Sequence, residues 1–221
     1  MGLITNIEKW GMPAAIGMAT EGIKAKYNHG VGGGGFGAAD MEIASRIDGA
    51  KVLAVIDEIE KVSPHLADWS LFAYSSPYWN AQENRQRLFS HLLHDWAMKL
   101  AGHGVFIQER TFRRVETLVP LIAGGLALEQ TSGADVRYHN SELQYQPVST
   151  RSALIAALVE FDCKEKDDFS ESFWKKRQRY YQNHWSVWQP HVDSIRAQLV
   201  SYDQLARTMF KKALENKNGA Y

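Results

Sequence analysis

Apolar residues recur at steps of three and four along most of this chain, and no stretch alternates apolar and polar residues for long. Steps of three and four place apolar side chains on one face of an α-helix, whereas a half-buried strand needs strict alternation. The spacing therefore predicts a mostly α fold, a helical bundle. The predicted helices cover 3–19 with a break near Pro13, 38–61, 64–76, 82–101, 108–128, 151–161, a stretch starting at Phe169 or Ser170, and 189–214. Within 108–128, Pro120 and the pair Gly124–Gly125 are expected kink or end points.

Composition narrows the class of protein further. The chain has 221 residues, of which 45% are hydrophobic and 11% aromatic, and its 25 basic side chains balance 25 acidic ones. Such a composition is not typical of disordered chains, and no window approaches the ~18 apolar residues of a membrane-spanning helix. The single cysteine, Cys163, allows neither an intramolecular disulfide nor a cysteine-based zinc site. We therefore expect a protein of a reducing cytoplasm with no membrane partner.

Glycine-rich and irregular stretches divide the chain. Residues 30–37 include six glycines and formally match a dinucleotide-binding fingerprint. Because neither a preceding strand nor a following βαβ unit is predicted, we interpret them as a flexible hinge. Residues 130–147 have no helical period and predict a linker, with a short hairpin as one option. The predicted parts are a Gly-rich N-terminal arm 1–37, a helical domain 38–129, a linker 130–148 and a C-terminal part 149–221.

The only sustained basic patch lies within residues 172–192, which contain no acid. Its basic residues are interleaved with aromatic ones and follow a helix and a polar turn, which is the order of a helix-turn-helix motif. The expected turn, 162–168, is longer than the usual three or four residues. Basic side chains neutralise phosphates, and side-chain amides can hydrogen-bond base edges. The predicted DNA-binding residues are Arg151, Lys175, Lys176, Arg177, Arg179, Gln182, Asn183 and His184; the alternative is the solvated face of an amphipathic helix.

A second, smaller basic cluster consists of Arg110, Arg113 and Arg114, with acids beside it in the sequence. Docking of a partner protein and a salt-bridged surface explain this cluster equally well. The sequence alone leaves both open.

Catalytic motifs are absent from the sequence: there is no nucleophile elbow, no H-E-x-x-H and no P-loop. His91, His94 and Asp95 are spaced so that one face of a helix could present all three to a metal ion. The outer face of a helix needs polar residues in any case. The adjacent acids within 57–60 are typical of a surface. We therefore expect a protein that is not an enzyme and that has no metal, cofactor or small-molecule substrate.

Three pairs of short segments resemble, in the same order, the lambda-like phage late-gene antiterminators, the Q proteins. These are 13–19 with 35–39, 50–53 with 71–74, and 185–186 with Pro190, Asp193, Ile195 and Leu199; residues 114–120 give a fourth, weaker match. Together the segments touch roughly a third of the chain, and each is short and apolar.

The resemblance implies a mostly helical protein of the bacterial host's cytoplasm that binds double-stranded DNA at a late promoter. Such a protein loads onto RNA polymerase that is paused with its sigma factor, and it suppresses pausing and termination. By this resemblance, Lys175, Lys176, Arg177, Arg179 and Gln182 would contact DNA. The cluster of Arg110, Arg113 and Arg114, where a partner protein could dock, is a weaker candidate for the polymerase contact. Several family members carry cysteine pairs of a zinc-binding insertion. This chain lacks those pairs, so either a metal-free module replaces the insertion or the relationship is one of analogy.

Two other classes of protein stay open. A helix-turn-helix repressor or a small DNA-packaging subunit would also bind DNA. A repressor is a stable dimer on a palindrome, a packaging subunit forms a ring, and an antiterminator of this type can be monomeric when free. An enzyme that uses the acids within 57–60 would need a carboxyl group of strongly raised pKa in a deep apolar pocket.

Overall fold

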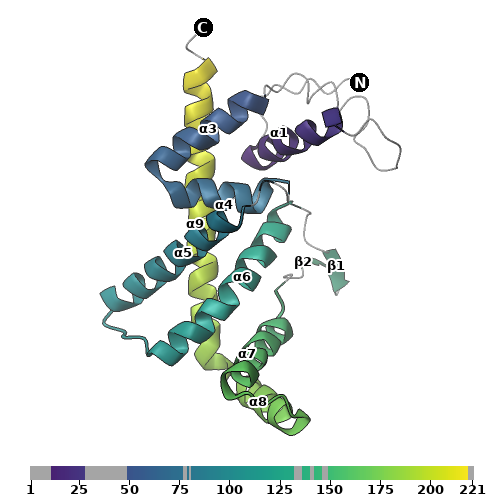
Figure 1. Ribbon diagram of the computed structural model, residues 1–221, viewed down its shortest axis with the longest axis vertical. Coiled ribbons are helices and arrows are strands. Elements are labelled where there is room, and N and C mark those ends of the chain that lie inside the picture. Colours follow the sequence, from purple (N-terminus) through teal and green to yellow (C-terminus); the bar gives the residue numbers. More distant parts are fainter. Residues whose placement is uncertain are drawn as a thin grey trace. The chain divides into compact units, whose positions relative to one another are not determined.

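The computed structural model describes residues 11–27, 49–76, 79, 81–131, 136–139, 142–145 and 149–218, and these are mostly helical, as predicted (Figure 1). The helices are α1 (Met12–Tyr27), α3 (Gly49–Val62), α4 (Pro64–Tyr74), α5 (Gln82–Gly102), α6 (Glu109–Thr131), α7 (Arg151–Lys166), α8 (Glu171–Asn183) and α9 (Trp185–Asn218). The strands β1 (Val136–His139) and β2 (Glu142–Tyr145) pair antiparallel, with Val136 opposite Tyr145. The predicted hinge at 30–37 lies outside the described residues.

The chain forms two compact units, and each joins segments that are distant in sequence. One unit comprises Met1–Leu88 with Ser201–Tyr221, and the other comprises Phe89–Val200. Helices α5 and α9 therefore each contribute to both units. The predicted division at residues 37, 129 and 148 follows chain order and stays a prediction.

The first unit is built on α1, α3 and α4, which pack against one another. Helix α4 begins at Pro64 directly after Ser63, as predicted, because proline is well suited to the first turn of a helix. Ile16, Val55 and Trp69 are buried in this unit. No helix in the described part of the chain is both long enough and apolar enough to cross a membrane.

Two buried aspartates tie this unit together. Asp68 accepts hydrogen bonds from Arg87 Nε at 2.6 Å and Nη2 at 2.7 Å, which joins α4 to the start of α5. Asp203 of α9 accepts from Trp69 Nε1 at 3.2 Å, from the Tyr74 hydroxyl and from Arg207 Nε at 2.7 Å. Both carboxylates therefore have a guanidinium partner in place of the water that they lose on folding.

The second unit places α6 against α7 and α7 against α8. Buried apolar residues such as Leu118, Ile122 and Leu158 lie in this unit. Helix α5 ends in a Schellman turn, in which Gly104 has φ +74° and Val105 N–H donates to Leu100 O at 2.9 Å. The predicted helix end at the glycines of 102–104 is thus confirmed.

Four predicted helix boundaries are wrong. Helix α1 begins at Met12, beside the predicted break near Pro13, because the missing N–H of a proline in the first turn has no intrahelical partner in any case. It runs to Tyr27 instead of ending at Ala19. Helix α6 runs past Leu128 to Thr131, and its Pro120 lies on the exposed side. Helix α7 continues to Lys166 and α9 already begins at Trp185, because buried side chains continue past the expected ends.

Gly124 and Gly125 are adjacent in α6 but have different surroundings. A Cβ added at Gly125 would lie 2.9 Å from Ser149 Cβ and 3.1 Å from Ser149 N, whereas a Cβ at Gly124 would meet nothing within 4 Å. The segment before α7 therefore approaches α6 closely at Gly125. The sequence predicted a kink or helix end at this pair; instead the glycine at 125 allows close packing in a continuous helix.

We expect Gly125→Ala to lower the free energy of unfolding by about 1–3 kcal/mol, because the new methyl group overpacks against Ser149. Gly124→Ala is the matched control and should raise it by about 0.5–1 kcal/mol, since alanine favours the helix more than glycine does. Urea unfolding of the two variants measures both values. Equal shifts for the two variants would contradict the close approach.

Candidate nucleic-acid interface

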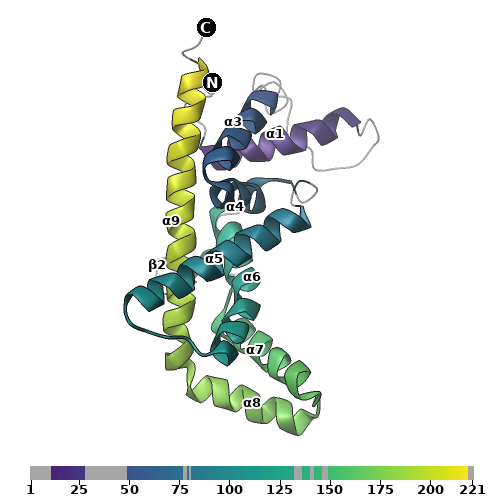
Figure 2. The same ribbon diagram turned by 60° about the vertical axis from the view of Figure 1, so that its left-hand side comes forward.

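Helices α7 and α8 form a helical hairpin joined by the turn 167–170 (Figure 2). Thr150 caps α7 through a hydrogen bond from Ala153 N–H at 3.2 Å, and Ser170 caps α8 through one from Phe173 N–H at 3.3 Å. Asp167 takes the left-handed conformation, φ 52° and ψ 36°, and ends α7. The predicted polar turn at 162–168 is therefore wrong, and the observed turn has the length usual in helix-turn-helix motifs. Assignment of such a motif stays a prediction.

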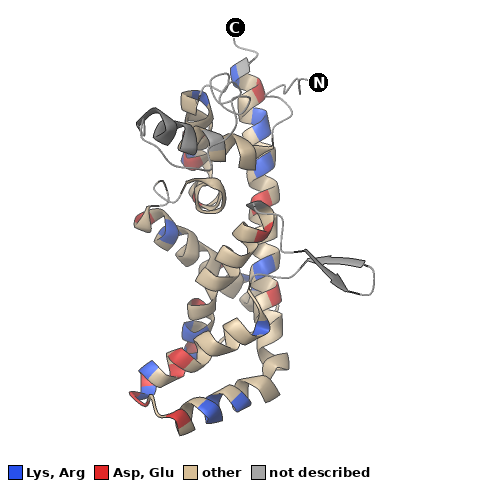
Figure 3. Cartoon of the chain, turned by 90° about the vertical axis from the view of Figure 1, so that its right-hand side faces the viewer, with Lys and Arg blue, Asp and Glu red and all other residues tan. Residues whose placement is uncertain are grey.

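Helix α8 has two faces of different character. It carries four basic residues and one acid, and its basic residues are visible as blue segments after the red helix start (Figure 3). Tyr181 is buried and Arg177 is partly buried on the inner face. Lys175, Arg179 and Gln182 are exposed and recur at steps of four and three on the opposite side of the helix. We call these three residues the outer face of α8.

Cations on and beside the outer face are available to an external ligand. Lys175 pairs with Glu171 at 2.6 Å, but both side chains are largely exposed, so this pair is weak. Within the described residues, Arg179 has no hydrogen bond or ion pair. Arg151 donates to the Gln182 carbonyl at 2.7 Å and lies over the Trp185 ring, which places its positive charge beside the outer face.

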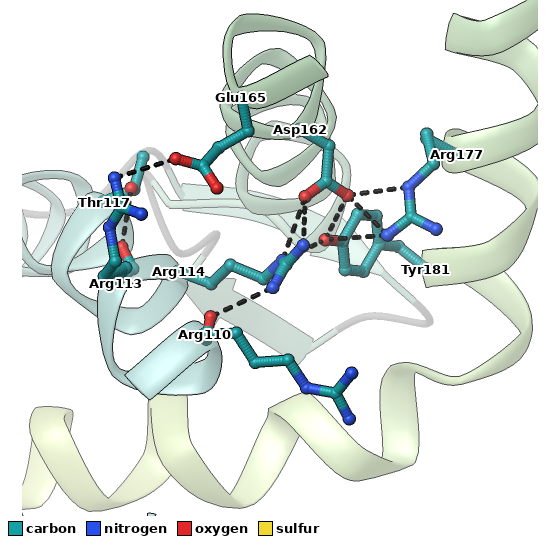
Figure 4. A network of polar contacts seen from close by, with 8 residues as sticks. All are labelled: Arg110, Arg113, Arg114, Thr117, Asp162, Glu165, Arg177 and Tyr181. Atoms are coloured by element: carbon teal, nitrogen blue, oxygen red, sulfur yellow. Dashed lines mark hydrogen bonds and ion pairs between the residues drawn. The ribbon is translucent and has the colours of Figure 1, made fainter. Parts of the chain in front are cut away.

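Arg177, predicted to contact DNA, instead points inward to Asp162 (Figure 4). Asp162 is 3% exposed and accepts from Arg177 Nε at 2.7 Å and from Arg114 Nη2 at 2.6 Å. The Tyr181 hydroxyl donates to the same carboxylate at 2.6 Å and accepts from Arg114 Nε at 3.0 Å. Arg177 is thus occupied because a buried carboxylate needs compensating charge. We call these four residues the Asp162 cluster.

Tyr181 stays protonated within this cluster. Burial, and then its hydrogen bond to Asp162, raise the pKa of Tyr181 to about 12. The hydroxyl is therefore a permanent hydrogen-bond donor to the carboxylate at neutral pH. This donor fixes the rotation of α8 relative to α7.

The Asp162 cluster also brings together the two basic clusters that are separate in the sequence. Arg114 comes from the predicted polymerase-binding cluster on α6, and Arg177 from the predicted DNA-binding patch on α8. Arg113 pairs with Glu165 at 2.8 Å, while the Arg110 side chain points away from Asp162 (Figure 4). The acid that joins the clusters was missed. The sequence did contain a signal for it, because position 162 follows the buried positions 155, 158 and 159 of α7 at helical spacing.

The remaining predicted DNA-binding residues are on the surface. Lys176, Asn183 and His184 are exposed, and the His184 ring lies 4.7 Å from that of Tyr180. Cys163, expected in a charged turn, is instead fully buried in α7, and burial raises the pKa of its thiol.

The residues considered for other chemistry are engaged locally. His91 Nε2 lies 3.4 Å from Asp95, which also accepts from Gln198 at 3.1 Å. The described residues contain no group of three or more His, Cys, Asp or Glu able to hold a metal ion. Glu60 accepts from Arg87, and Glu58 pairs with Lys217 at 2.7 Å, so these acids have basic partners.

Comparisons with protein-family models, with curated proteins and with solved structures found no match to this chain.

We expect Asp162→Asn to lower the free energy of unfolding by about 3–5 kcal/mol, because it leaves two partly buried guanidinium groups without their counter-charge. Glu165→Gln is the matched control on the same helix. It removes an acid that is 36% exposed and whose ion pair among the described residues is with Arg113, so the expected loss is about 0–1 kcal/mol. Urea unfolding at neutral pH compares the two variants. A loss for Asp162→Asn no larger than that for Glu165→Gln would contradict the structural role of the cluster.

His191 couples the stability of this unit to pH. Its ring lies 5.4 Å from that of Trp96 and 6.3 Å from that of Trp188, and burial lowers its pKa below the usual value near 6.5. The unfolded chain therefore takes up a proton at this position at a higher pH than the folded chain does.

We expect the free energy of unfolding to fall as the pH is lowered from about 6.5 to the depressed pKa of His191. His191→Gln should reduce that slope, because it removes the titrating group. Exposed His94 lies on α5, and His94→Gln is the control, expected to keep the slope. Urea unfolding from pH 7.5 to 5 is the measurement. An unchanged slope in His191→Gln would refute the assignment.

Proposed function

We propose that this chain binds double-stranded DNA through the outer face of α8 and acts as a phage late-gene transcription antitermination factor. The observation that supports DNA binding is the exposure of Lys175 and Arg179 on a helix whose inner face is held by the Asp162 cluster. A helix held in this way presents its cations in a constant direction.

The chemistry of this face suits a DNA backbone. Lys175 can exchange its exposed partner Glu171 for a phosphate at little cost, and Arg179 can bind a phosphate without breaking any contact within the described residues. Gln182 is exposed on the same side and carries an amide that can pair with a base edge in the major groove. Arg151 adds a third cation beside Gln182.

The antitermination role comes from the resemblance to the Q proteins. DNA binding at a late promoter would bring the protein to a paused polymerase that still holds its sigma factor. Arg110 and Arg113 are exposed and remain candidates for the polymerase contact, whereas the Arg114 guanidinium is engaged by Asp162.

The double variant Lys175→Ala/Arg179→Ala tests the DNA surface. We expect the slope of log Kd against log salt to fall by about 1.8, because each lost phosphate contact lowers it by about 0.9. Fluorescence anisotropy with labelled duplex DNA over a range of NaCl concentrations measures this slope.

Lys211→Ala/Lys212→Ala is the matched control, since it removes the same formal charge from exposed positions on α9 outside the outer face. Its salt slope should equal that of the unchanged protein. The surface assignment is wrong if both double variants lower the slope equally, or if neither does.

A transcription assay tests the second half of the proposal. Its template carries a late promoter, a promoter-proximal pause and a downstream terminator, and purified polymerase transcribes it with and without the protein. We expect read-through that needs the promoter-proximal DNA and is lost in the Lys175→Ala/Arg179→Ala variant. Specific DNA binding without read-through would indicate a repressor or a packaging subunit instead. The oligomeric state would then distinguish these two functions.

A further inference from the structure

A cavity of about 660 Å³ opens beside the Asp162 cluster in the second unit. Its lining residues come from α6, α7, α8 and the first residues of α9. This volume lies within the range of pockets that hold small molecules or single cofactor groups. The cavity is therefore suited to one compact ligand.

Its lining is strongly basic. Five cations face two acids, and both acids already have partners: Asp162 binds Arg114 and Arg177, and Glu165 binds Arg113. The other lining cations are Arg110, Lys166 and Lys176, and none of them has an ion pair within the described residues. A ligand that enters this cavity meets an excess of positive charge, which favours an anion.

The other walls are aromatic. Phe173, Tyr180 and Trp188 line the cavity together with Tyr181. Tyr180 is 42% exposed and Trp188 only 7%, so Tyr180 is the more open of these two rings to a ligand. The Arg177 guanidinium lies 4.5 Å from the Tyr180 ring centroid, so one face of this ring already binds a cation. Flat aromatic faces beside free cations are the combination that binds the bases and phosphates of unpaired nucleotides.

We propose that this cavity binds a single nucleotide unit, with its phosphate at Lys176 and Lys166 and its base against the exposed Tyr180 ring. The unit is either a free nucleoside monophosphate or the 5′-phosphorylated end of a strand. The two sources share the same chemistry, and the experiment below separates them.

This site is distinct from the outer face of α8. The cavity-lining residues of α8 are 173, 176–177 and 180–181, which recur at steps of three and four on one side of the helix. Lys175 and Arg179 lie on the other side and do not line the cavity. Nucleotide binding therefore does not depend on duplex binding, and either can fail without the other.

The test is isothermal titration calorimetry on the full chain, with thymidine 5′-monophosphate, thymidine and inorganic phosphate as probes. We expect the monophosphate to bind more tightly than either fragment. Lys176→Ala should lower the affinity for the monophosphate about 10- to 100-fold, because it removes one charge-assisted hydrogen bond. Lys164→Ala on α7 is the control: it removes the same charge from an exposed side chain that does not line the cavity, and it should leave the affinity unchanged.

Tyr180→Leu should lower the affinity for the monophosphate about tenfold, because it removes a stacking surface. It should leave the affinity for inorganic phosphate unchanged. Short oligothymidylates with and without a 5′-phosphate separate the two sources. Tighter binding of the phosphorylated strand than of the monophosphate assigns the site to strand ends, and weaker binding assigns it to free nucleotides. The proposal is overturned if the monophosphate does not bind, if inorganic phosphate binds equally well, or if the two lysine variants weaken binding equally.

Discussion

The arrangement of the second unit depends on one buried carboxylate. Asp162 joins three helices, because its partners Arg114, Arg177 and Tyr181 come from α6 and α8 while it lies on α7. Removing a carboxylate from water is unfavourable unless its hydrogen-bonding capacity is met, and here two guanidinium groups and a hydroxyl meet it. These hydrogen bonds form only when Arg177 and Tyr181 face Asp162, so they favour that rotation of α8 about its axis. Apolar packing alone is less specific, since many rotations bury similar areas.

The two surfaces of α8 follow from that rotation. With Arg177 and Tyr181 turned toward Asp162, the period of the helix directs Lys176 to the cavity and Lys175 and Arg179 to the opposite side. Four cations within residues 175–179 thereby acquire three different environments: a partly buried ion pair, a cavity and an open face. Sequence composition treats them as one basic patch, whereas their environments assign them to different chemistry.

The sequence pattern predicted the helical class and most helices, because steps of three and four record which face is buried. It was least accurate where a buried position is polar. Asp162 was interpreted as part of a turn, since an acid within a charged run resembles solvent-exposed chain, and α7 was therefore ended at Phe161 instead of Lys166. The same error separated the Arg110–Arg114 cluster from the patch on α8. Which guanidinium pairs with which carboxylate depends on contacts 15 and 48 residues apart, and no local pattern records such contacts.

Asp68 and Asp203 of the first unit are compensated in the same way. Each is buried at a helix–helix contact and accepts a hydrogen bond from an arginine. These two and Asp162 are the buried acids within the described residues. A buried ion pair contributes little net stability compared with well-packed apolar residues, because desolvation offsets most of its attraction. Its larger effect is on specificity, since a slip of one residue along either helix would leave a charge unpaired in the interior. If the outer face of α8 binds DNA as proposed, a fixed rotation of that helix matters more than a few additional kcal/mol of stability.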